Sequence, residues 1–320
     1  IAKEHILTRI NPHASMELFG QEINDETFAV CKSDMLIKGE NAENVKYGSS
    51  FSRDGLRSST FDYMLSNPPY GKEWKQDDEF IRNEYERGTA GRFSAGLPRI
   101  DDGQLLFLQH MISKMHSPES KEITRIAVVF NGSPLFTGDA GSGESEIRRW
   151  VIENDWLETI IALPNQLFYN TGILTYIWIL TNKKEERRKG RIALINATDM
   201  YVKMRKSLGD KRNEISEEQI AEITDLYLEN IANGRVKIFD REEFGYRRIK
   251  VERPLRMNFR ASEDRIKKLD EQAGFNNLAV SKIKKDLKTR LREEQEGKKL
   301  QEQIRRVLDD MKDILYKDYD

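Results

Sequence analysis

The 320-residue sequence predicts an α/β protein with a mostly parallel sheet and a helical C-terminal extension. Apolar, strand-like runs alternate with helical stretches as far as residue 197, which is the pattern of a sheet covered by helices on both faces. These runs are almost continuously apolar, as in strands buried on both sides. From about residue 212 the chain becomes polar and helical in its periodicity. We therefore expect a core at 1–210, a helix and connecting segment at 211–261, and a charged helical tail at 262–320.

Short apolar runs predict the strands, which are residues 18–23, 44–50, 61–66, 123–130, 156–163, 172–180 and 191–197. Helical spacing of apolar residues predicts helices at 25–38, 104–115, 145–154 and 216–233. Residues 71–103 contain few apolar residues, and so long a segment without periodicity is usually functional or mobile. Residues 251–259 are expected to form an extended link.

Charged residues make up 33% of the chain, but the 53 basic and 54 acidic residues nearly cancel. Global charge therefore does not identify a nucleic-acid-binding protein, and phosphate contacts would need local basic patches. Two stretches, 183–191 and 203–212, are basic enough to contact phosphates, although solvated connectors would have the same composition.

Composition also limits the class of protein. No apolar run reaches the roughly 18–20 residues of a membrane span, and no signal peptide is visible, so we expect a cytoplasmic protein with no membrane partner. The single cysteine, Cys31, lies in the predicted helix 25–38 and is expected to be a buried, reduced thiol. The four histidines form no cluster with metal-ligand spacing, so no metal site is predicted.

The stretch Asn67-Pro68-Pro69-Tyr70 follows the predicted strand 61–66 and carries the chemistry. An exocyclic amine on an aromatic ring is a poor nucleophile because its lone pair is delocalised. Two oxygen acceptors at its two protons would free the lone pair, and the Asn67 side chain and the Pro68 backbone each offer a carbonyl. The two prolines hold this bracket rigidly, and Tyr70 offers a face for stacking. The alternative interpretation is that these residues only form a turn that ends the strand.

"SNPPYG" at 66–71 resembles motif IV of the S-adenosylmethionine-dependent DNA amino-methyltransferases. More closely, the chain resembles the modification subunit of type I restriction–modification enzymes over roughly residues 1–260. The stretches 19–40, 156–180 and 244–259 carry this wider resemblance. The resemblance implies a Rossmann-like methyltransferase fold that is incomplete at the N-terminus, because the family's glycine-rich cofactor loop would precede residue 1.

The same resemblance implies roles for individual residues. Asn67, Pro68 and Tyr70 correspond to the bracket for the target adenine, and Phe168 to an aromatic on the other face of a flipped base; a core aromatic is the alternative for Phe168. Glu22 corresponds to the carboxylate that holds the ribose of S-adenosylmethionine. Where the family often has an acidic residue against the cofactor's adenine, this chain has Ser49 and Ser50.

The implied function is methyl transfer to N6 of adenine in DNA, with a specificity subunit and a restriction subunit as partners. Two alternatives stay open: methylation of a glutamine side chain, since the same bracket suits an amide, and a non-catalytic assembly subunit. Apolar residues spaced along the tail 262–320 favour docking on a partner, although packing within the chain is also possible. The stretch 138–145 nearly fits a phosphate-binding loop, but Glu144 replaces the required lysine, and a mobile loop is the better interpretation.

Overall fold

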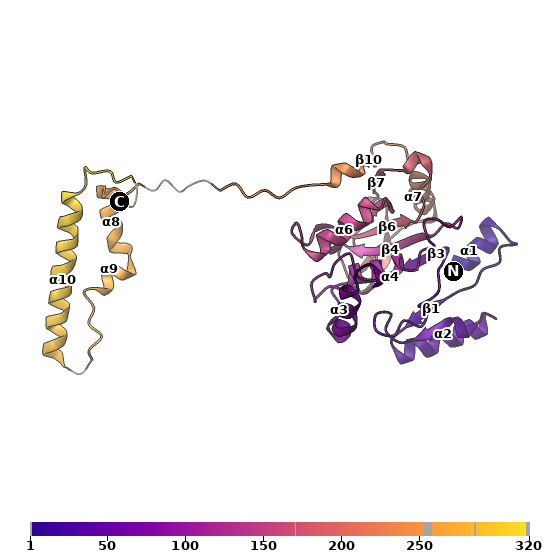
Figure 1. Ribbon diagram of the computed structural model, residues 1–320, viewed down its shortest axis with the longest axis horizontal. Helices are drawn as coiled ribbons and strands as arrows, with labels where there is room; N and C mark the ends of the chain where they lie inside the picture. Colours follow the sequence, from indigo (N-terminus) through magenta and orange to yellow (C-terminus); the bar gives the residue numbers. More distant parts are fainter. Residues whose placement is uncertain (1, 170, 253–257, 285, 318–320) are drawn as a thin grey trace. The chain divides into compact units, whose positions relative to one another are not determined.

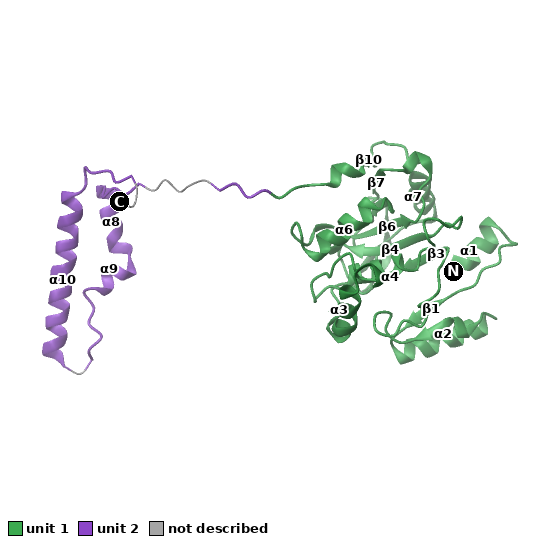
Figure 2. Cartoon of the chain, viewed as in Figure 1, with its two compact units in different colours: residues 1–248 green, residues 249–320 purple. Residues whose placement is uncertain are grey.

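The computed structural model describes residues 2–169, 171–252, 258–284 and 286–317. The chain forms two compact units, residues 1–248 and residues 249–320 (Figures 1 and 2). The first unit holds a six-stranded sheet in the order β10-β7-β5-β6-β4-β3. Its strands are β3 (Tyr63–Ser66), β4 (Arg125–Asn131), β5 (Leu157–Ala162), β6 (Thr175–Thr181), β7 (Arg191–Asn196) and β10 (Val236–Asp240).

The prediction of a mostly parallel sheet is wrong, because the central sheet is mixed. Strands β3, β4, β5 and β7 run in one direction, whereas β6 and β10 run in the other. Strand β6 lies between β4 and β5 and is antiparallel to both. The described residues between β5 and β6 form a loop without a helix, so the chain turns back beside β5 instead of crossing over to a parallel position.

The predicted strands 18–23 and 44–50 are present in shortened form, but they lie outside the central sheet. Strand β1 (Gly20–Glu22) pairs in parallel with β2 (Val45–Tyr47) as a separate two-stranded sheet. Helix α2 (Asp25–Ile37) connects them and packs Met35 on this small sheet. Cys31 on α2 is a free thiol but only half-buried, so the expectation of a buried cysteine was too strong.

Helices cover both faces of the central sheet. Helices α4 (Gln104–Ile112) and α6 (Gly143–Glu153) pack on the face that carries Val128 and Trp178. Helix α7 (Glu217–Glu229) packs on the face that carries Ile161 and Ile195. Neighbouring residues of a strand point to opposite faces, which is why adjacent Ile160 and Ile161 belong to different cores.

The sequence prediction for residues 71–103 needs correction. This segment contains helix α3 (Asp78–Glu86) and buries Trp74, Ile81 and Phe93 against Phe51. Its few apolar residues are widely spaced, so periodicity did not reveal that these three fill core positions. The hairpin of β8 (Val202–Leu208) and β9 (Lys211–Glu214) was not predicted, and neither was the edge strand β10.

The second unit consists of helices. A long helix, α10 (Leu287–Asp310), packs with the short helices α8 (Glu263–Lys267) and α9 (Ala273–Asn277). Gly297 is buried where α10 meets the backbone of Leu278. The predicted extended link 251–259 lies partly outside the described residues, which omit 253–257.

Candidate active site

The carboxyl ends of β3, β4, β5 and β7 meet at one edge of the central sheet, because these four strands run in the same direction. Ligands of open α/β sheets bind at such an edge. Asn67 follows β3, Asn131 ends β4, and the loop 164–171 follows β5. The structure places Asn67 and the loop that carries Phe168 at the same edge of the central sheet, whereas Glu22 ends a strand of the separate two-stranded sheet.

Asn67 is exposed at this edge, whereas the neighbouring Pro68 is buried and Tyr70 is half-buried. The Tyr70 hydroxyl donates a hydrogen bond of 2.7 Å to the side-chain oxygen of Asn67. No described residue donates to the backbone carbonyl of Pro68. An amide oxygen accepts two hydrogen bonds, so Asn67 keeps one lone pair free while Tyr70 orients it.

Tyr70 is suited to this orienting role because it stays protonated. Burial raises the pKa of its phenol to about 12. The hydroxyl therefore remains a donor to Asn67 over the whole range in which the protein would be assayed.

A buried polar cluster that sequence reasoning missed fixes the end of β4 beside the bracket. Gln104, which is fully buried, donates to both carboxylate oxygens of Asp102 and, at 3.0 Å, to the Asn131 side chain. The backbone N–H of Asn131 donates back to Gln104 at 3.2 Å. The only sequence signal was a pair of polar residues at the start of an apolar helix, which also suits a simple helix terminus.

The residues predicted to hold a cofactor lie on the small sheet and the loop that follows it. Glu22 ends β1 and is half-buried, and its carboxylate accepts a 2.8 Å hydrogen bond from the backbone N–H of Asn24. The Ser49 hydroxyl donates to the carboxylate of Asp77 at 2.9 Å. Sequence reasoning missed Asp77, which places a carboxylate beside the serine that stands where the resembled family often has an acid. Ser50 contributes its backbone carbonyl to Arg92 at 2.7 Å.

Arg92 holds the loop that contains Ser49 and Ser50. Its guanidinium donates to the carbonyls of Ser50 and Phe51, forms an ion pair with Glu84, and approaches Nδ1 of His110 at 2.9 Å. Burial, and then the neighbouring Arg92 charge, lowers the pKa of His110 to about 4. The imidazole is therefore neutral near pH 7, and its Nδ1 accepts a hydrogen bond from Arg92.

A second ion pair completes this cluster. Lys114 donates to Asp54 at 2.6 Å, and both side chains are almost fully buried. Burial opposes the ionisation of Asp54, but the hydrogen bond from Lys114 holds the pKa of this carboxyl below its ordinary value. Charges of both signs are thus balanced beneath the loop 49–54.

Phe168 is half-buried and forms a bridge with Thr171 inside the β5–β6 loop. Strands β4 and β6 separate β5 from β3, which corresponds to about 14 Å between the β5 and β3 axes. Among the described residues, no ring contact joins Phe168 to Tyr70. The two aromatics lie at the same edge of the sheet, with β6 and β4 between the strands that carry them.

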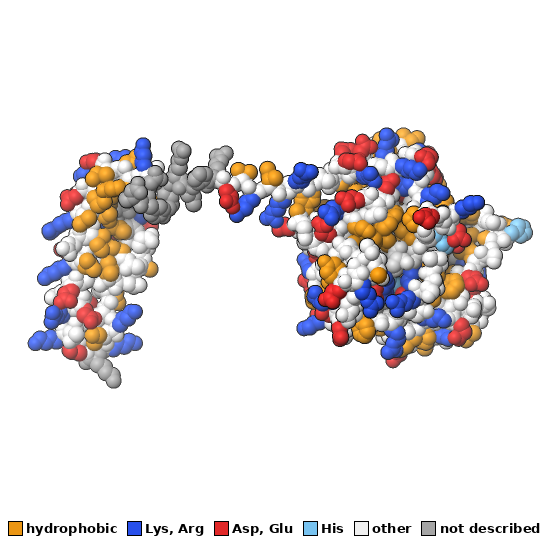
Figure 3. Space-filling model, viewed as in Figure 1, with side chains coloured by type: hydrophobic (Ala, Val, Ile, Leu, Met, Phe, Trp, Pro, Cys, Tyr) orange, Lys and Arg blue, Asp and Glu red, His pale blue; other side chains and the backbone are white. Residues whose placement is uncertain are grey.

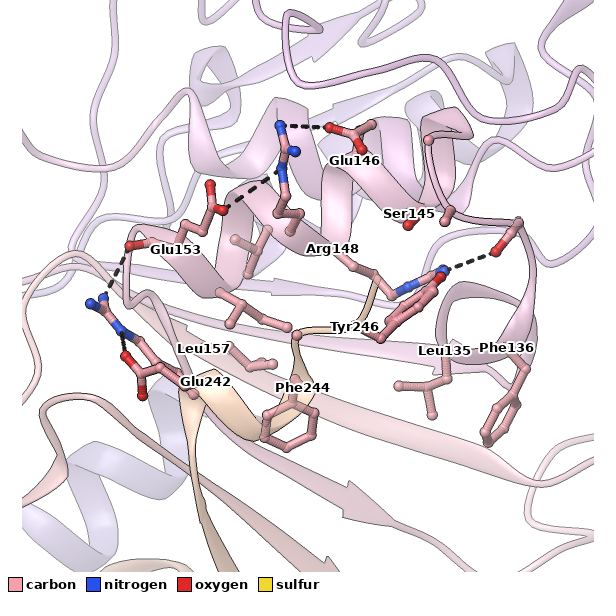
Figure 4. A pocket seen from close by; sticks show the side chains of 18 of the residues that line it. Leu135, Phe136, Ser145, Glu146, Arg148, Glu153, Leu157, Glu242, Phe244 and Tyr246 are labelled. Atoms are coloured by element: carbon pink, nitrogen blue, oxygen red, sulfur yellow. Dashed lines mark hydrogen bonds and ion pairs between the residues drawn. The ribbon is translucent and has the colours of Figure 1, made fainter. Parts of the chain in front are cut away.

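A cavity lies away from these residues. A volume of about 1050 Å³ opens between α6 and residues 241–247 (Figure 4). Apolar residues such as Leu157 and Phe244 line it, and Arg148 in its wall donates to the carbonyls of Pro134 and Thr137. None of the predicted site residues lines this cavity.

The near match to a phosphate-binding loop at 138–145 has a structural role. Glu144 is buried, and its carboxylate accepts a 2.9 Å hydrogen bond from the backbone N–H of Arg99. Gly143 is required because a Cβ there would lie 1.7 Å from the Leu97 carbonyl oxygen. The stretch packs the start of α6 against residues 96–99, and a carboxylate stands where a phosphate would need a cation.

Within the described ranges, no helix combines the length and the apolar content needed to cross a bilayer. The same residues contain no group of three or more His, Cys, Asp or Glu side chains arranged to hold a metal ion. On the face of residues 1–248 shown in Figure 3, basic and acidic side chains are interspersed.

The fold and the strand-end site define an α/β protein with its polar constellation at the carboxyl edge of the sheet. The chain belongs to the N-6 DNA Methylase family, whose model matches residues 1–278. The resemblance stated from the sequence is therefore confirmed at the level of the family.

Known relatives agree with this assignment. The chain is 28% identical over 213 residues to the type I restriction enzyme MjaIX methylase subunit of Methanocaldococcus jannaschii, which covers 66% of this chain and 36% of the relative. It is 32% identical over 194 residues to the type I restriction enzyme HindI methylase subunit of Haemophilus influenzae. This match covers 60% of this chain and 40% of the relative. The chain thus spans about two fifths of the length of these relatives.

Among solved structures, the chain is similar to the type I restriction-modification methyltransferase subunit of Streptococcus thermophilus. The TM-score is 0.59 at 25% identity, over 71% of this chain and 45% of that subunit. A modification subunit of a putative type I restriction enzyme from Vibrio vulnificus has the same fold, with a TM-score of 0.52 at 20% identity.

Proposed function

We propose that this chain forms the catalytic region of a methylase subunit that transfers a methyl group from S-adenosylmethionine to N6 of adenine in DNA. The observation that carries the proposal is the bracket at the end of β3, where Tyr70 orients the exposed amide of Asn67 and no described residue donates to the carbonyl of the buried Pro68. Membership of the N-6 DNA Methylase family supports DNA over a glutamine side chain as the substrate.

In this proposal the two carbonyl oxygens accept hydrogen bonds from the two N6 hydrogens of an extruded adenine. Accepting both protons localises the nitrogen lone pair and leaves it free to attack. The bracket acts through preorganised dipoles and needs no charged base. Extrusion of the base costs a few kcal/mol, and stacking on Tyr70 and Phe168 would offset this.

The residues on the small sheet fit S-adenosylmethionine in part. One carboxylate oxygen of Glu22 accepts from Asn24, which leaves the other for a ribose hydroxyl. The Ser49 hydroxyl donates its proton to Asp77 and accepts the backbone N–H of Phe51 at 3.1 Å, so it has no proton to offer the cofactor, and Asp77 brings a carboxylate to the same place. When bound, S-adenosylmethionine supplies the methyl group; this chain's residues hold it and present the amine.

The partners follow from the same proposal. We assign DNA recognition to a separate specificity subunit and restriction to another subunit of a type I complex. Residues 262–320 are the candidate docking segment, because Leu300 and Val307 on α10 are exposed while Ile304 is turned inward. If the complex transfers no methyl group to DNA, the alternative of a non-catalytic assembly subunit is favoured.

The test is methyl transfer from tritiated S-adenosylmethionine to unmodified DNA, with the complete methylase subunit in its complex. Asn67→Ala removes one acceptor and should reduce the rate by about 10²–10³-fold, as loss of an oriented dipole does in other enzymes. The exposed position of Asn67 means that the fold should be retained.

Asn154→Ala is the matched control. Asn154 is exposed at the end of α6, before β5, and therefore lies at the opposite edge of the sheet. Its side chain bonds only within its own helix, to the Trp150 carbonyl. This variant should keep wild-type activity, and equal rates for Asn67→Ala and wild type would refute the bracket.

A further inference from the structure

The hairpin β8–β9 has no assigned role, yet it is bound closely to the loop that carries Phe168. The backbone N–H groups of Arg212 and Asn213 donate to the Gln166 carbonyl at 3.0 and 3.2 Å. The Asn213 side chain, which is buried, donates to the Asn165 carbonyl at 3.0 Å. The N–H of Asp210 donates to the carbonyl of Tyr169 at 3.0 Å.

These bonds hold a strained loop. Gln166 has a φ of +56°, which is uncommon for a residue other than glycine, and such strain persists only where the surroundings enforce it. At the hairpin tip, Gly209 has a φ of +60°, and a Cβ there would lie 2.7 Å from the Tyr169 carbonyl oxygen. The hairpin and the loop 164–171 therefore form one unit at the carboxyl edge of the sheet.

The hairpin carries an excess of basic side chains. Residues 202–214 carry five basic side chains against two acidic ones, Asp210 and Glu214. None of the five forms an ion pair with a described residue, and all but Lys211 are exposed. Lys211 instead lies 5.6 Å from the ring centre of Tyr169, whose side chain is 59% exposed. The basic residues are Lys203, Arg205, Lys206, Lys211 and Arg212.

The other basic stretch, 183–191, is different. Five of its six cations are paired with carboxylates, whereas Lys183 forms no ion pair with a described residue. The stretch follows β6 at the opposite edge of the sheet. The pairs are Lys184–Asp155, Arg187–Glu185, Arg188–Glu185, Lys189–Glu186 and Arg191–Asp240. The two basic stretches have similar compositions, and only the ion pairs in the structure distinguish them.

We infer that the hairpin β8–β9 and the loop 164–171 form a DNA-contact element, in which the unpaired cations of the hairpin bind backbone phosphates next to the extruded base. Unpaired, exposed cations beside an aromatic loop provide the electrostatic and stacking contacts that a nucleic-acid strand requires. The inference rests on the proposed DNA substrate, and it adds the surface that holds the strand.

The test is the salt dependence of binding of the complete methylase subunit to a fluorescent duplex DNA. Arg205→Gln/Lys206→Gln should weaken binding by on the order of tenfold at 0.1 M salt and lower the salt slope by about 2, because each lost phosphate contact lowers it by about 0.9. The control is Lys183→Gln/Lys189→Gln, which removes the same charge from the exposed connector at the opposite edge. The control should bind as wild type does.

Equal affinities and slopes for the two double variants would overturn the inference. Binding to polyglutamate of matched charge is a second check. If Arg205→Gln/Lys206→Gln weakened this binding as much as it weakens DNA binding, the surface would fit an acidic protein as well as phosphates, and the inference would be overturned. Asn67→Ala should bind DNA with the wild-type slope. If the hairpin variant lost DNA affinity while Asn67→Ala still transferred methyl groups at the wild-type rate, the bracket would be refuted and the DNA-contact element would be supported.

Discussion

At the scale of single residues, the hydrogen bond between Tyr70 and Asn67 is the most informative contact. A side-chain amide on an exposed strand end is free to rotate unless a partner orients it. The Tyr70 hydroxyl supplies this partner at 2.7 Å and leaves one lone pair of the Asn67 oxygen for a substrate. The tyrosine therefore has an orienting role in addition to its stacking face.

Tyr70→Phe should lower the methyl-transfer rate about five- to tenfold, because a hydrogen bond of this kind contributes about 1 kcal/mol. The ratio of wild-type to variant rate should stay constant up to about pH 10, since burial raises the pKa of Tyr70 to about 12. Rate measurements across pH check both points. Tyr63→Phe, at an exposed position on β3, is the control and should be silent; a variant at position 70 as fast as wild type would contradict the orienting role.

His110 gives a residue-scale prediction about stability. Its pKa is about 4 in the folded protein and 6.5 ordinarily, so the unfolded chain binds the proton more readily. The contribution of the neutral imidazole to stability is therefore complete above pH 6.5 and is lost as the pH falls to about 4, by up to about 3 kcal/mol. The groups facing it are Arg92, Glu84, Asp54 and Lys114.

Denaturant unfolding of wild type and His110→Gln between pH 4 and 8 checks this. The difference between the two proteins should shrink as the pH falls, because only wild type takes up a proton at position 110 on unfolding. A difference independent of pH would contradict the neutral imidazole.

At the scale of elements, most strands and helices could be predicted because apolar periodicity is local. The strands around β4, β5 and β7 and helices α2, α4, α6 and α7 lie close to their predicted positions. The hairpin β8–β9 could not be predicted, since it is exposed and polar and owes its position to backbone bonds with the loop 164–171. The direction of β6 depends on its neighbours, β4 and β5, which local periodicity does not specify.

The site followed the same division. The position of Asn67 could be predicted because the end of an apolar strand leaves a local signal, whereas Phe168 was named only through the resemblance to the family. Asp77 and Gln104 could not be predicted, since their roles arise from contacts with Ser49 and Asn131, residues far away in the sequence.

Helix α10 provides a prediction at this scale. Alanine usually stabilises a helix by about 1 kcal/mol relative to glycine. At Gly297, however, a Cβ would lie 1.9 Å from the Leu278 carbonyl oxygen, so Gly297→Ala should instead destabilise residues 249–320 by about 1–3 kcal/mol. Amide hydrogen exchange in α10 should accelerate at least severalfold.

Gly274→Ala is the matched control in α9, because a Cβ there meets nothing within 4 Å. Exchange in this variant should be unchanged or slower. Slower exchange in both variants would show that α10 does not need the close approach at Gly297.

At the scale of the whole molecule, the charges nearly cancel, and function depends on where they are left unpaired. The buried ions beneath the loop 49–54 and most cations of 183–191 are paired with carboxylates. None of the hairpin cations at the edge that holds Asn67 forms an ion pair with a described residue. The family model extends from residue 1 to residue 278, across the first unit and into the second. The proposed site residues Asn67, Pro68, Tyr70 and Phe168 all lie in the first unit.

The most direct measurement is the identity of the methylated product. DNA incubated with S-adenosylmethionine and the complete methylase complex is digested to nucleosides and analysed by mass spectrometry. A bracket of two carbonyl acceptors around an exocyclic amine of adenine predicts N6-methyl-2′-deoxyadenosine, formed by wild type and not by Asn67→Ala. Methyl groups found only on cytosine or on protein would contradict the account.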